Sequence, residues 1–476
     1  MVEHLPVAFQ LGRPDHGDSF SMIIRTFSHH SHVPDRFAIE GPLYVGGEGE
    51  IYFSRCGRFV IKLYHDRLNS PERENFLKKV LFLGRNLGED LKYLCWPQAL
   101  VEELDGVRKI GVITERIPRP PFRELVDYIF SPREFKRAVE EGIHWLNYLR
   151  VAHSLARLVS VLHGRGCAHA DLHFNNFLVD MRSGRAVMID LDGLVIPGFL
   201  PPQVLGMIPF MAPEIISRKS SPDQGSDRHS LAVLVFQTLL LRNPLQPLTC
   251  FQSDDAEQDE LIGWGREAVF SENPYNFRNR PKRLGYPLYQ QGVLSVNILP
   301  PEVRALFEQC FIQGLFHPNR RPLAREWEMT LNQTFFSVWP CRCCEQHFPY
   351  PVWISSGTRR CPFCGKALLP PFPVVLRVYH AKTAEVSVVR PGCLVLGHRY
   401  RVIEKMLKND GSRLSYGEVR LQAGRYHFIP DLPVSVLPPG ESGNRRRYRE
   451  GEGLELLRGM LIEFGENWFE VIEDGL

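Results

Sequence analysis

HADLHFNNFLV (residues 169–179) and AVMIDLDGLV (186–195) are the two stretches that decide how this chain folds. The first places two His, one Asp and two Asn among apolar residues. The second is a β-type apolar run that ends on two Asp. Acidic and amide side chains at a strand end can hold a metal ion and orient a hydroxyl, whereas a polar surface turn would do neither. The surrounding chain must distinguish these two interpretations.

Composition limits the class of protein. The chain has 476 residues, which is enough for two to four domains, and is 44% hydrophobic and 23% charged. A net charge of +3 gives no general attraction to nucleic acid or acidic lipid. The N-terminus lacks a signal-peptide pattern, and the longest apolar helical stretch (231–241) is too short to span a bilayer. We therefore expect a cytoplasmic protein that binds neither membrane nor nucleic acid.

The order of patterns along the chain predicts a β-rich lobe, an α-rich lobe and two smaller parts. β-type segments dominate residues 40–116, with one helical segment at 70–87, and helical patterns dominate residues 120–335. The predicted domains are an irregular leader (1–36), a domain of two lobes (37–117 and 118–335), a cysteine-rich ribbon (336–370) and a β-rich C-terminal module (371–476).

The segment YVGGEGEIYFS (44–54) reads as a strand, a turn and a second strand, with Gly46, Gly47 and Gly49 in the turn. Glycines allow backbone N–H groups to approach phosphate oxygens without a Cβ clash, although a plain hairpin is also glycine-rich.

The next predicted strand, FVIK (59–62), places Lys62 in an apolar environment. An unpaired ammonium is costly there, so Lys62 needs an anion. The helical segment 70–87 offers Glu72 and Glu74, and we prefer Glu74.

With these residues together, the chain resembles a protein kinase. HADLHFNNFLV resembles the kinase catalytic loop HRDLKxxNxL through His169, Asp171, Leu172, Asn176 and Leu178. The resemblance implies that Asp171 orients the substrate hydroxyl and that Asn176 holds Mg²⁺.

VMID (187–190) then resembles the segment that ends on the metal-binding aspartate, here Asp190. The resemblance also implies an α+β, two-lobed kinase fold with Gly46, Gly47, Gly49, Ile51, Lys62, Glu74, Glu115 and Ile117 around ATP.

Further kinase motifs follow in the expected order. MAPE (211–214) resembles the APE motif, and Arg321 resembles the arginine that pairs with its glutamate, here Glu214. Asp227 resembles the aspartate that supports the catalytic loop, and ITERI (113–117) fits the adenine-binding hinge. The resemblance covers roughly residues 40–335.

Several positions depart from the kinase pattern. Leu191 and Asp192 replace the usual Phe and Gly, so either aspartate could be the main metal ligand; we favour Asp190 because it directly ends the strand. Ala170 replaces an arginine that reads activation-loop phosphate, and residues 190–214 contain no Ser, Thr or Tyr. We infer that phosphorylation of this loop does not control the protein. His173 replaces the usual lysine.

Two CxxC pairs predict a structural zinc site. Cys341, Cys344, Cys361 and Cys364 supply the four thiolates that tetrahedral Zn²⁺ requires, and four thiolates leave no open catalytic position. Cys343 could replace Cys344, and His347 is a weaker substitute.

Together, GGEGEIY (46–52), HADLH (169–173) and DLDG (190–193) resemble the bacterial Hanks-type kinases of stress-response clusters that also encode a phosphatase and a von Willebrand A-type protein. It implies an ATP-dependent Ser/Thr protein kinase that uses Mg²⁺ or Mn²⁺, carries structural Zn²⁺, and has protein substrates, a cognate phosphatase and a von Willebrand A-type protein as partners. The alternatives are a nucleotide-binding pseudokinase scaffold and a small-molecule kinase like the aminoglycoside and lipopolysaccharide kinases.

Overall fold

A computed structural model describes residues 22–28, 32–86, 93–203, 206–247, 255–350, 359–370, 372–380, 393–396, 400–403, 415–440, 445–464 and 467–474. By its internal contacts the chain divides into two units. Unit 1 comprises Met1–Pro118 together with Asp190–Asp192, and unit 2 comprises Arg119–Ile189 and Gly193–Leu476.

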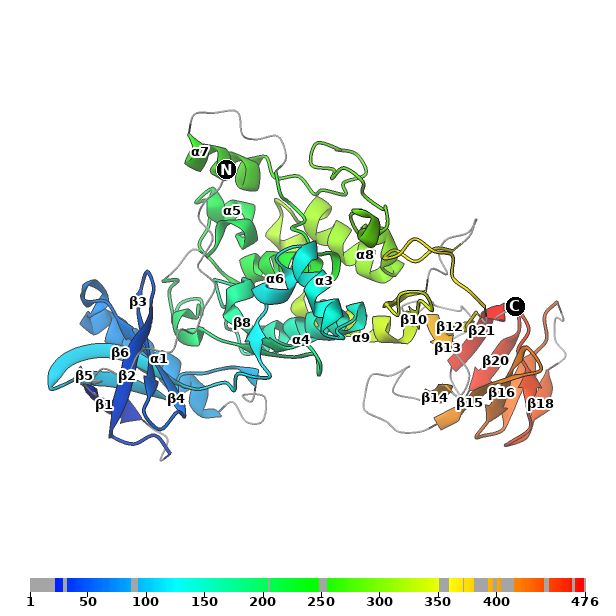
Figure 1. Ribbon diagram of the computed structural model, residues 1–476, viewed down its shortest axis with the longest axis horizontal. Coiled ribbons are helices and arrows are strands. Elements are labelled where there is room, and N and C mark those ends of the chain that lie inside the picture. The colour runs from blue at the N-terminus through cyan, green and yellow to red at the C-terminus, as the bar shows by residue number, and fades with distance from the viewer. Residues whose placement is uncertain are drawn as a thin grey trace. The chain divides into compact units, whose positions relative to one another are not determined.

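Unit 1 is a closed antiparallel barrel with the strand order β1-β2-β3-β4-β6-β5 and one long helix, α1 (Figure 1). Alternate residues of β4, such as Phe59, Ile61 and Leu63, point into its core, as the period of two predicts. Helix α1 begins where the Ser70 hydroxyl accepts the Arg73 amide. The elements are β1 (Met22–Ser28), β2 (Arg36–Val45), β3 (Gly49–Ser54), β4 (Phe59–Tyr64), η1 (Asp66–Leu68), α1 (Pro71–Leu83), η2 (Gly84–Asn86), β5 (Ala99–Leu104) and β6 (Val107–Glu115).

The prediction of an irregular leader over residues 1–36 is wrong for Met22–Ser28. This segment is β1, which pairs with β2 on one side and β5 on the other and so closes the barrel. The β-rich unit therefore begins before residue 37. Residues 1–21 lie outside the described part of the chain.

The helical part of unit 2 is organised around α4 and α6, which pack against each other (Figure 1). Almost all of α6 is buried, and the Trp145 indole N–H donates to the Leu239 carbonyl at 2.9 Å. The helices are α2 (Val126–Ile129), α3 (Pro132–Glu140), α4 (Trp145–Gly164), α5 (Pro213–Ile216), α6 (Gln224–Leu240), α7 (Ala256–Glu260), the π-helix η7 (Leu261–Arg266), α8 (Pro301–Glu308), the π-helix η10 (Gln309–Gln313) and α9 (Ala324–Thr334).

A small antiparallel sheet in unit 2 carries the two deciding stretches of sequence. Its strands are β7 (Arg123–Glu124), β8 (Phe177–Asp180) and β9 (Arg185–Met188), in the order β7-β8-β9. Between β8 and the preceding loop lies a short 3₁₀ helix, η4 (Phe174–Asn176). β8 thus contains the last residues of the stretch 169–179, and β9 contains the first residues of the stretch 186–195.

The described residues after 335 contain β10 (Val338–Pro340) and β11 (His347–Pro349), followed by two antiparallel sheets that share one apolar core. Their status as a separate domain stays a prediction. The strands are β12 (Val374–His380), β13 (Cys393–Leu396), β14 (Tyr400–Ile403), β15 (Ser415–Gln422), β16 (Arg425–Pro430), β17 (Val434–Leu437), β18 (Arg446–Tyr448), β19 (Leu454–Glu455), β20 (Leu461–Phe464) and β21 (Asn467–Asp474).

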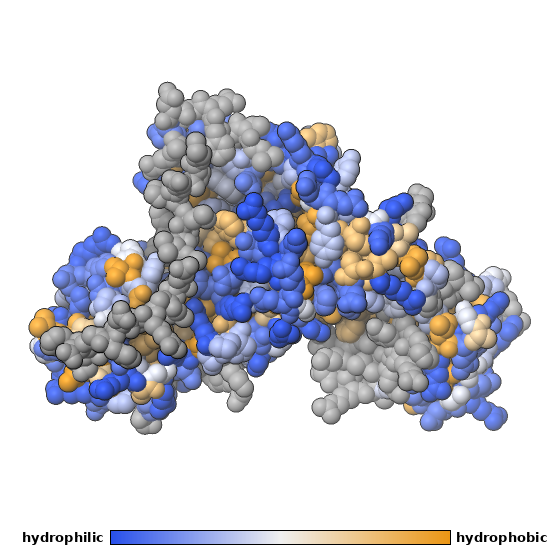
Figure 2. All heavy atoms as spheres, in the orientation of Figure 1, coloured by the Kyte–Doolittle hydropathy of each residue, from blue (hydrophilic) through white to orange (hydrophobic). Residues whose placement is uncertain are grey.

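The described surface is mostly hydrophilic on the face shown in Figure 2, with hydrophobic side chains scattered across it. Among the described helices, none combines the length and the apolarity that crossing a bilayer requires.

Candidate active site

The loop of residues 169–176 is held in place by Asp227 at the start of α6. The Asp227 carboxylate accepts the backbone N–H of His169 at 2.7 Å and that of Ala170 at 3.0 Å, and it is 1% exposed. Ala170 has φ of +70°, a left-handed conformation that a non-glycine residue adopts at a cost. The two charge-assisted hydrogen bonds offset this cost, so the predicted support of the loop by Asp227 is confirmed.

Asp171 is the only carboxylate within this loop, and its neighbours favour its charged form. Burial alone would raise its pKa, but the His173 ring and then the charge of His169 and the Met207 backbone more than compensate, so the pKa of Asp171 lies below its usual value. His173 Nδ1 accepts the Asn175 amide at 3.2 Å, and His173 Nε2 lies 3.3 Å from Asp171 Oδ2 and 3.1 Å from Asn176 Nδ2. The loop thus presents an ionised carboxylate.

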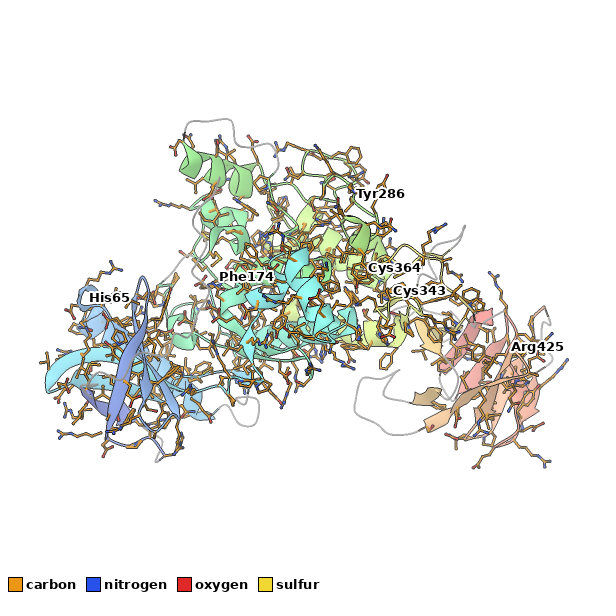
Figure 3. The ribbon with its side chains drawn as sticks, in the orientation of Figure 1. His65, Phe174, Tyr286, Cys343, Cys364 and Arg425 are labelled. Atoms are coloured by element: carbon orange, nitrogen blue, oxygen red, sulfur yellow. The ribbon has the colours of Figure 1, made fainter. Side chains whose placement is uncertain are left out.

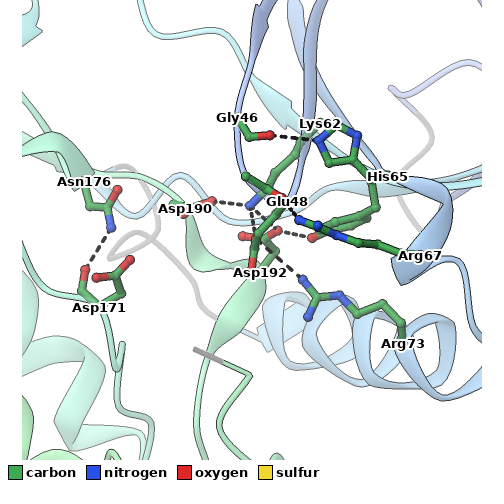
Figure 4. A network of polar contacts seen from close by, with 12 residues as sticks. Gly46, Glu48, Lys62, His65, Arg67, Arg73, Asp171, Asn176, Asp190 and Asp192 are labelled. Atoms are coloured by element: carbon green, nitrogen blue, oxygen red, sulfur yellow. Dashed lines mark hydrogen bonds and ion pairs between the residues drawn. The ribbon is translucent and has the colours of Figure 1, made fainter. Parts of the chain in front are cut away.

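Asn176 follows Asp171 by five residues and contacts it within the same loop. Its Nδ2 donates to the Asp171 carbonyl at 2.8 Å (Figure 4), so Oδ1 is the atom that could coordinate a metal. The Asn176 carbonyl accepts the Ile189 amide at 3.0 Å, which ties the loop to the residue just before Asp190.

Lys62 on β4 is surrounded by three carboxylates, as the need for an anion predicted (Figure 4). Its Nζ lies 2.9 Å from Glu48, 2.9 Å from Asp190 and 3.1 Å from Asp192. Burial would lower the pKa of Lys62, but the attraction of Asp192 and Asp190 raises it well above its ordinary value. Lys62 is therefore charged.

The pKa values of Asp190 and Asp192 move in opposite directions. Burial and then the charge of Asp192 raise the pKa of Asp190. Burial acts the same way on Asp192, but Lys62, hydrogen bonds from Asp190 and Tyr64, and the charge of Arg73 lower its pKa.

The prediction that Glu74 pairs with Lys62 is wrong. Glu74 forms ion pairs with Lys78 at 2.7 Å and with Arg108 at 2.6 Å, and Glu72 is exposed. Both residues are on faces of α1 that do not meet Lys62. Arg73 is the charged residue of α1 that is buried.

The glycine turn (residues 46–49) is a tight turn in which the Gly46 amide donates to the Gly49 carbonyl at 2.8 Å. A Cβ at Gly49 would lie 2.2 Å from the Leu63 carbonyl oxygen, so this glycine is required by close packing on β4. A Cβ at Gly47 would meet nothing within 4 Å, so that glycine is not explained by packing.

Two side chains outside any motif hold the glycine turn. His65 Nε2 lies 2.8 Å from the Gly46 carbonyl, and Arg67 donates to the Gly47 carbonyl (Figure 4). Because they contact backbone atoms from the segment after β4, the motif spacing gave no signal for them.

The remaining predicted ATP-site residues lie on the barrel strands or just after them. Ile51 is opposite Lys62 in the β3–β4 pairing, Glu115 ends β6, and Ile117 lies two residues after that end. Their contact with adenine stays a prediction.

Arg321 and Glu214 form the predicted pair. The two guanidinium nitrogens of Arg321 donate to the two Glu214 carboxylate oxygens at 2.6 and 2.7 Å. Arg321 also donates to the carbonyls of Gly225, Gly314 and Leu315, and its side chain is 0% exposed. A single buried cation therefore joins α5 to the start of α6.

The four predicted zinc ligands converge. The ligand atoms of Cys341, Cys344, Cys361 and Cys364 lie within 4.8 Å of one another. The Cys341–Cys364 and Cys344–Cys361 sulfurs are 3.8 and 3.6 Å apart, and ligands of a tetrahedral Zn²⁺ with Zn–S bonds of about 2.3 Å would be about 3.8 Å apart. The residues therefore fit zinc.

The alternative ligands do not join this cluster. Cys343 is exposed, and His347 Nδ1 lies 3.0 Å from the Glu345 carbonyl. Figure 3 labels Cys343 and Cys364, which belong to the two CxxC turns. The residue after each second cysteine, Glu345 or Gly365, has a positive φ, so the two turns share one geometry.

The cysteine cluster is packed on the helical part of unit 2. The ring of Phe363 stacks on that of Phe135 with centroids 5.7 Å apart, and the Gln346 side chain accepts the Trp145 amide at 2.9 Å. The Leu288 amide donates to the Pro362 carbonyl at 2.9 Å. These contacts are consistent with a structural role for a bound zinc ion.

Comparison with known proteins gives fold neighbours only. No protein-family model and no curated protein matches the chain. Among solved structures it is similar to a rhoptry kinase from Toxoplasma gondii, with 16% identity and a TM-score of 0.44 over 65% of this chain and 82% of that chain. It is also similar to ROP2 from Toxoplasma gondii, described as a virulence factor with a protein-kinase fold and no enzymatic activity, with 16% identity and a TM-score of 0.42 over the same shares. Likenesses of this size do not inform on activity or substrate.

Proposed function

We propose that this chain is an ATP-dependent protein kinase that transfers the γ-phosphate of Mg-ATP to a protein hydroxyl of Ser or Thr. The observation that carries the proposal is the loop of residues 169–176. It presents an ionised Asp171 next to the amide of Asn176, and Asp227 fixes its backbone.

Each group has a defined task in this mechanism. Asp171 accepts a hydrogen bond from the attacking hydroxyl and orients it toward phosphorus. The oxygens of Asn176 and Asp190 are the kind that Mg²⁺ prefers, and the metal, when bound, neutralises phosphate charge. Lys62 attracts phosphate oxygens, and backbone N–H groups of the glycine turn cover them. Catalysis is then mainly positioning and charge stabilisation.

The surroundings of Asp171 favour a protein acceptor. Gly206, Met207 and Phe210 line a small cavity beside Asp171, in the segment that leads into the Glu214–Arg321 pair. This segment and its ion pair belong to the protein-kinase pattern, which supports a peptide substrate over a small molecule. We further propose a cytoplasmic location, with a cognate phosphatase and a von Willebrand A-type protein as partners, which co-purification would test.

One observation favours a second candidate, the pseudokinase scaffold. Glu48 lies in the glycine turn, and its carboxylate is 2.9 Å from Lys62. A carboxylate there competes with phosphate oxygens for the same ammonium and repels them. A chain that keeps this pair would bind nucleotide weakly and would act through its partners.

Transfer of labelled γ-phosphate distinguishes the two functions. The wild-type chain is incubated with Mg²⁺ or Mn²⁺ and a generic protein substrate, with Asp171→Ala beside it. We expect label on protein that disappears with Asp171→Ala. ATP binding without transfer in either chain would overturn the kinase proposal and favour the scaffold, and transfer only to small hydroxylated compounds would favour the small-molecule kinase.

A further inference from the structure

Helix α1 presents a cation toward Lys62 in place of an anion. Arg73 is 8% exposed, its guanidinium carbon lies 4.5 Å from the centre of the Tyr64 ring, and one of its nitrogens lies 3.9 Å from Glu48. Glu74, which the kinase pattern assigns to Lys62, is bound to two other cations. The helix therefore cannot supply the partner of Lys62 in the usual way.

Asp192 has the contacts that such a partner needs. Its side chain is only 5% exposed, and its Oδ2 lies 3.1 Å from Lys62 Nζ. The Tyr64 hydroxyl donates to the same oxygen. Burial and the charge of Asp192 raise the pKa of Tyr64 well above its ordinary value, so this phenol remains a neutral donor.

Asp190 is placed differently, although it also contacts Lys62. Its side chain is 39% exposed, against 5% for Asp192. Asp190 has φ of +63°, and an Asp tolerates this left-handed conformation better than most residues. The exposed carboxylate of Asp190 can accept a metal from solvent, whereas the buried carboxylate of Asp192 contacts Lys62 and Tyr64.

We propose that Asp192 is the positioning residue that holds Lys62, in the place that a helix glutamate has in the protein-kinase pattern, and that Asp190 is the metal ligand of the two. This inference rests on the proposed kinase function. It explains the DLDG sequence, because a glycine at position 192 would leave Lys62 without its buried partner.

The test compares three variants, Asp192→Asn, Asp190→Asn and Glu74→Gln, by phosphoryl transfer at varied Mg²⁺. For Asp192→Asn we expect kcat to fall by about 10- to 100-fold, the usual effect of a misplaced catalytic group, with an unchanged Mg²⁺ requirement. Asp190→Asn should raise the Mg²⁺ concentration needed for half-maximal rate. Glu74→Gln should change neither quantity.

A double-mutant cycle shows whether Asp192 acts through Lys62. If it does, adding Asp192→Asn to Lys62→Met should cost nothing further. Additive losses, or a Mg²⁺ requirement that rises in Asp192→Asn as in Asp190→Asn, would overturn the proposal, and so would a loss in Glu74→Gln equal to that in Asp192→Asn.

Two controls keep the outcome clear. If Asp192→Asn does not fold, Tyr64→Phe removes the hydroxyl donor while keeping the ring against Arg73; a smaller fall in kcat is expected, and no fall would contradict the proposal. If the wild-type chain transfers no phosphate, the proposed kinase function is wrong. The binding of ATP without metal then tests whether Asp192 positions Lys62, independently of catalysis. Asp192→Asn should then weaken binding, because Lys62 loses the buried carboxylate that holds its ammonium in place. Glu74→Gln should not, because Glu74 pairs with Lys78 and Arg108.

Discussion

Arg321 donates two parallel hydrogen bonds to Glu214, and removing either side chain would leave the other charge largely shielded from water and without its partner. Breaking such a pair costs about 3–5 kcal/mol, because the remaining ion loses both water and its partner. We therefore expect Arg321→Ala to lower the free energy of unfolding by about that amount. Chemical denaturation measures it. Arg320→Ala, at the exposed neighbouring position, is the matched control and should change little; equal losses in both variants would contradict the structural role of the pair.

Asp227→Asn should reduce transfer by loosening the loop that carries Asp171. The amide keeps one acceptor oxygen, whereas the carboxylate accepts two backbone N–H groups, from His169 and Ala170. Since Ala170 holds a left-handed conformation, losing one bond frees the loop to relax. We expect kcat to fall by about 100-fold with an unchanged circular dichroism spectrum. A variant with full activity would show that the loop does not need this anchor.

The order of strands and helices and the Glu214–Arg321 pair could be predicted from sequence because they depend on local patterns and on a spacing typical of one family. The four cysteines could be predicted for the same reason. β1 could not, because its pairing with β5 is a contact between residues about 75 positions apart, and a short strand without a strong alternation gives little local signal.

The preference for Glu74, about one helical turn before Leu77 and Lys78, was wrong because that position is not on the buried stripe of α1. Arg73 lies three, four and seven residues before the buried Phe76, Leu77 and Val80, which places it on the apolar stripe of α1. The roles of Asp192 and Tyr64 could not be derived in this way. They depend on which side chains surround Lys62 in three dimensions.

Glu48→Gln should strengthen nucleotide binding. The substitution keeps the size of the side chain but removes the negative charge that lies 2.9 Å from Lys62, in the turn proposed to cover the phosphates. Removing a repulsion of about 1 kcal/mol, the value for two unit charges about 4 Å apart when water screens them, corresponds to about a five-fold lower Kd for ATP. Calorimetry measures the Kd for ATP of the wild-type chain and of Glu48→Gln. Glu50→Gln, on the adjoining strand β3, is the control. Weaker binding in Glu48→Gln would show that Glu48 supports the site.

Stability should fall as the pH drops below neutrality, in part through His153. Burial, and then the charge of Arg157, lower the pKa of His153 from 6.5 to about 4. The unfolded chain therefore binds a proton at a pH where the folded chain does not, so the stability contribution is lost as the pH falls from about 6.5 toward 4. Denaturation at a series of pH values should show a smaller slope for His153→Phe than for wild type. An identical slope would mean that His153 does not contribute.

Removal of zinc should destabilise the helical part of unit 2 as well as the cysteine cluster. Phe363 and Gln346 connect the cluster to α3 and α4, so unfolding of the two CxxC turns would expose the apolar surface that they cover. We expect about one zinc per chain by metal analysis, and a lower melting temperature after chelation or in Cys361→Ser. Cys343→Ser is the matched control, because this cysteine is exposed and outside the cluster, and it should retain both metal and stability. Loss of zinc in Cys343→Ser with retention in Cys344→Ser would mean that the ligand set is the alternative one.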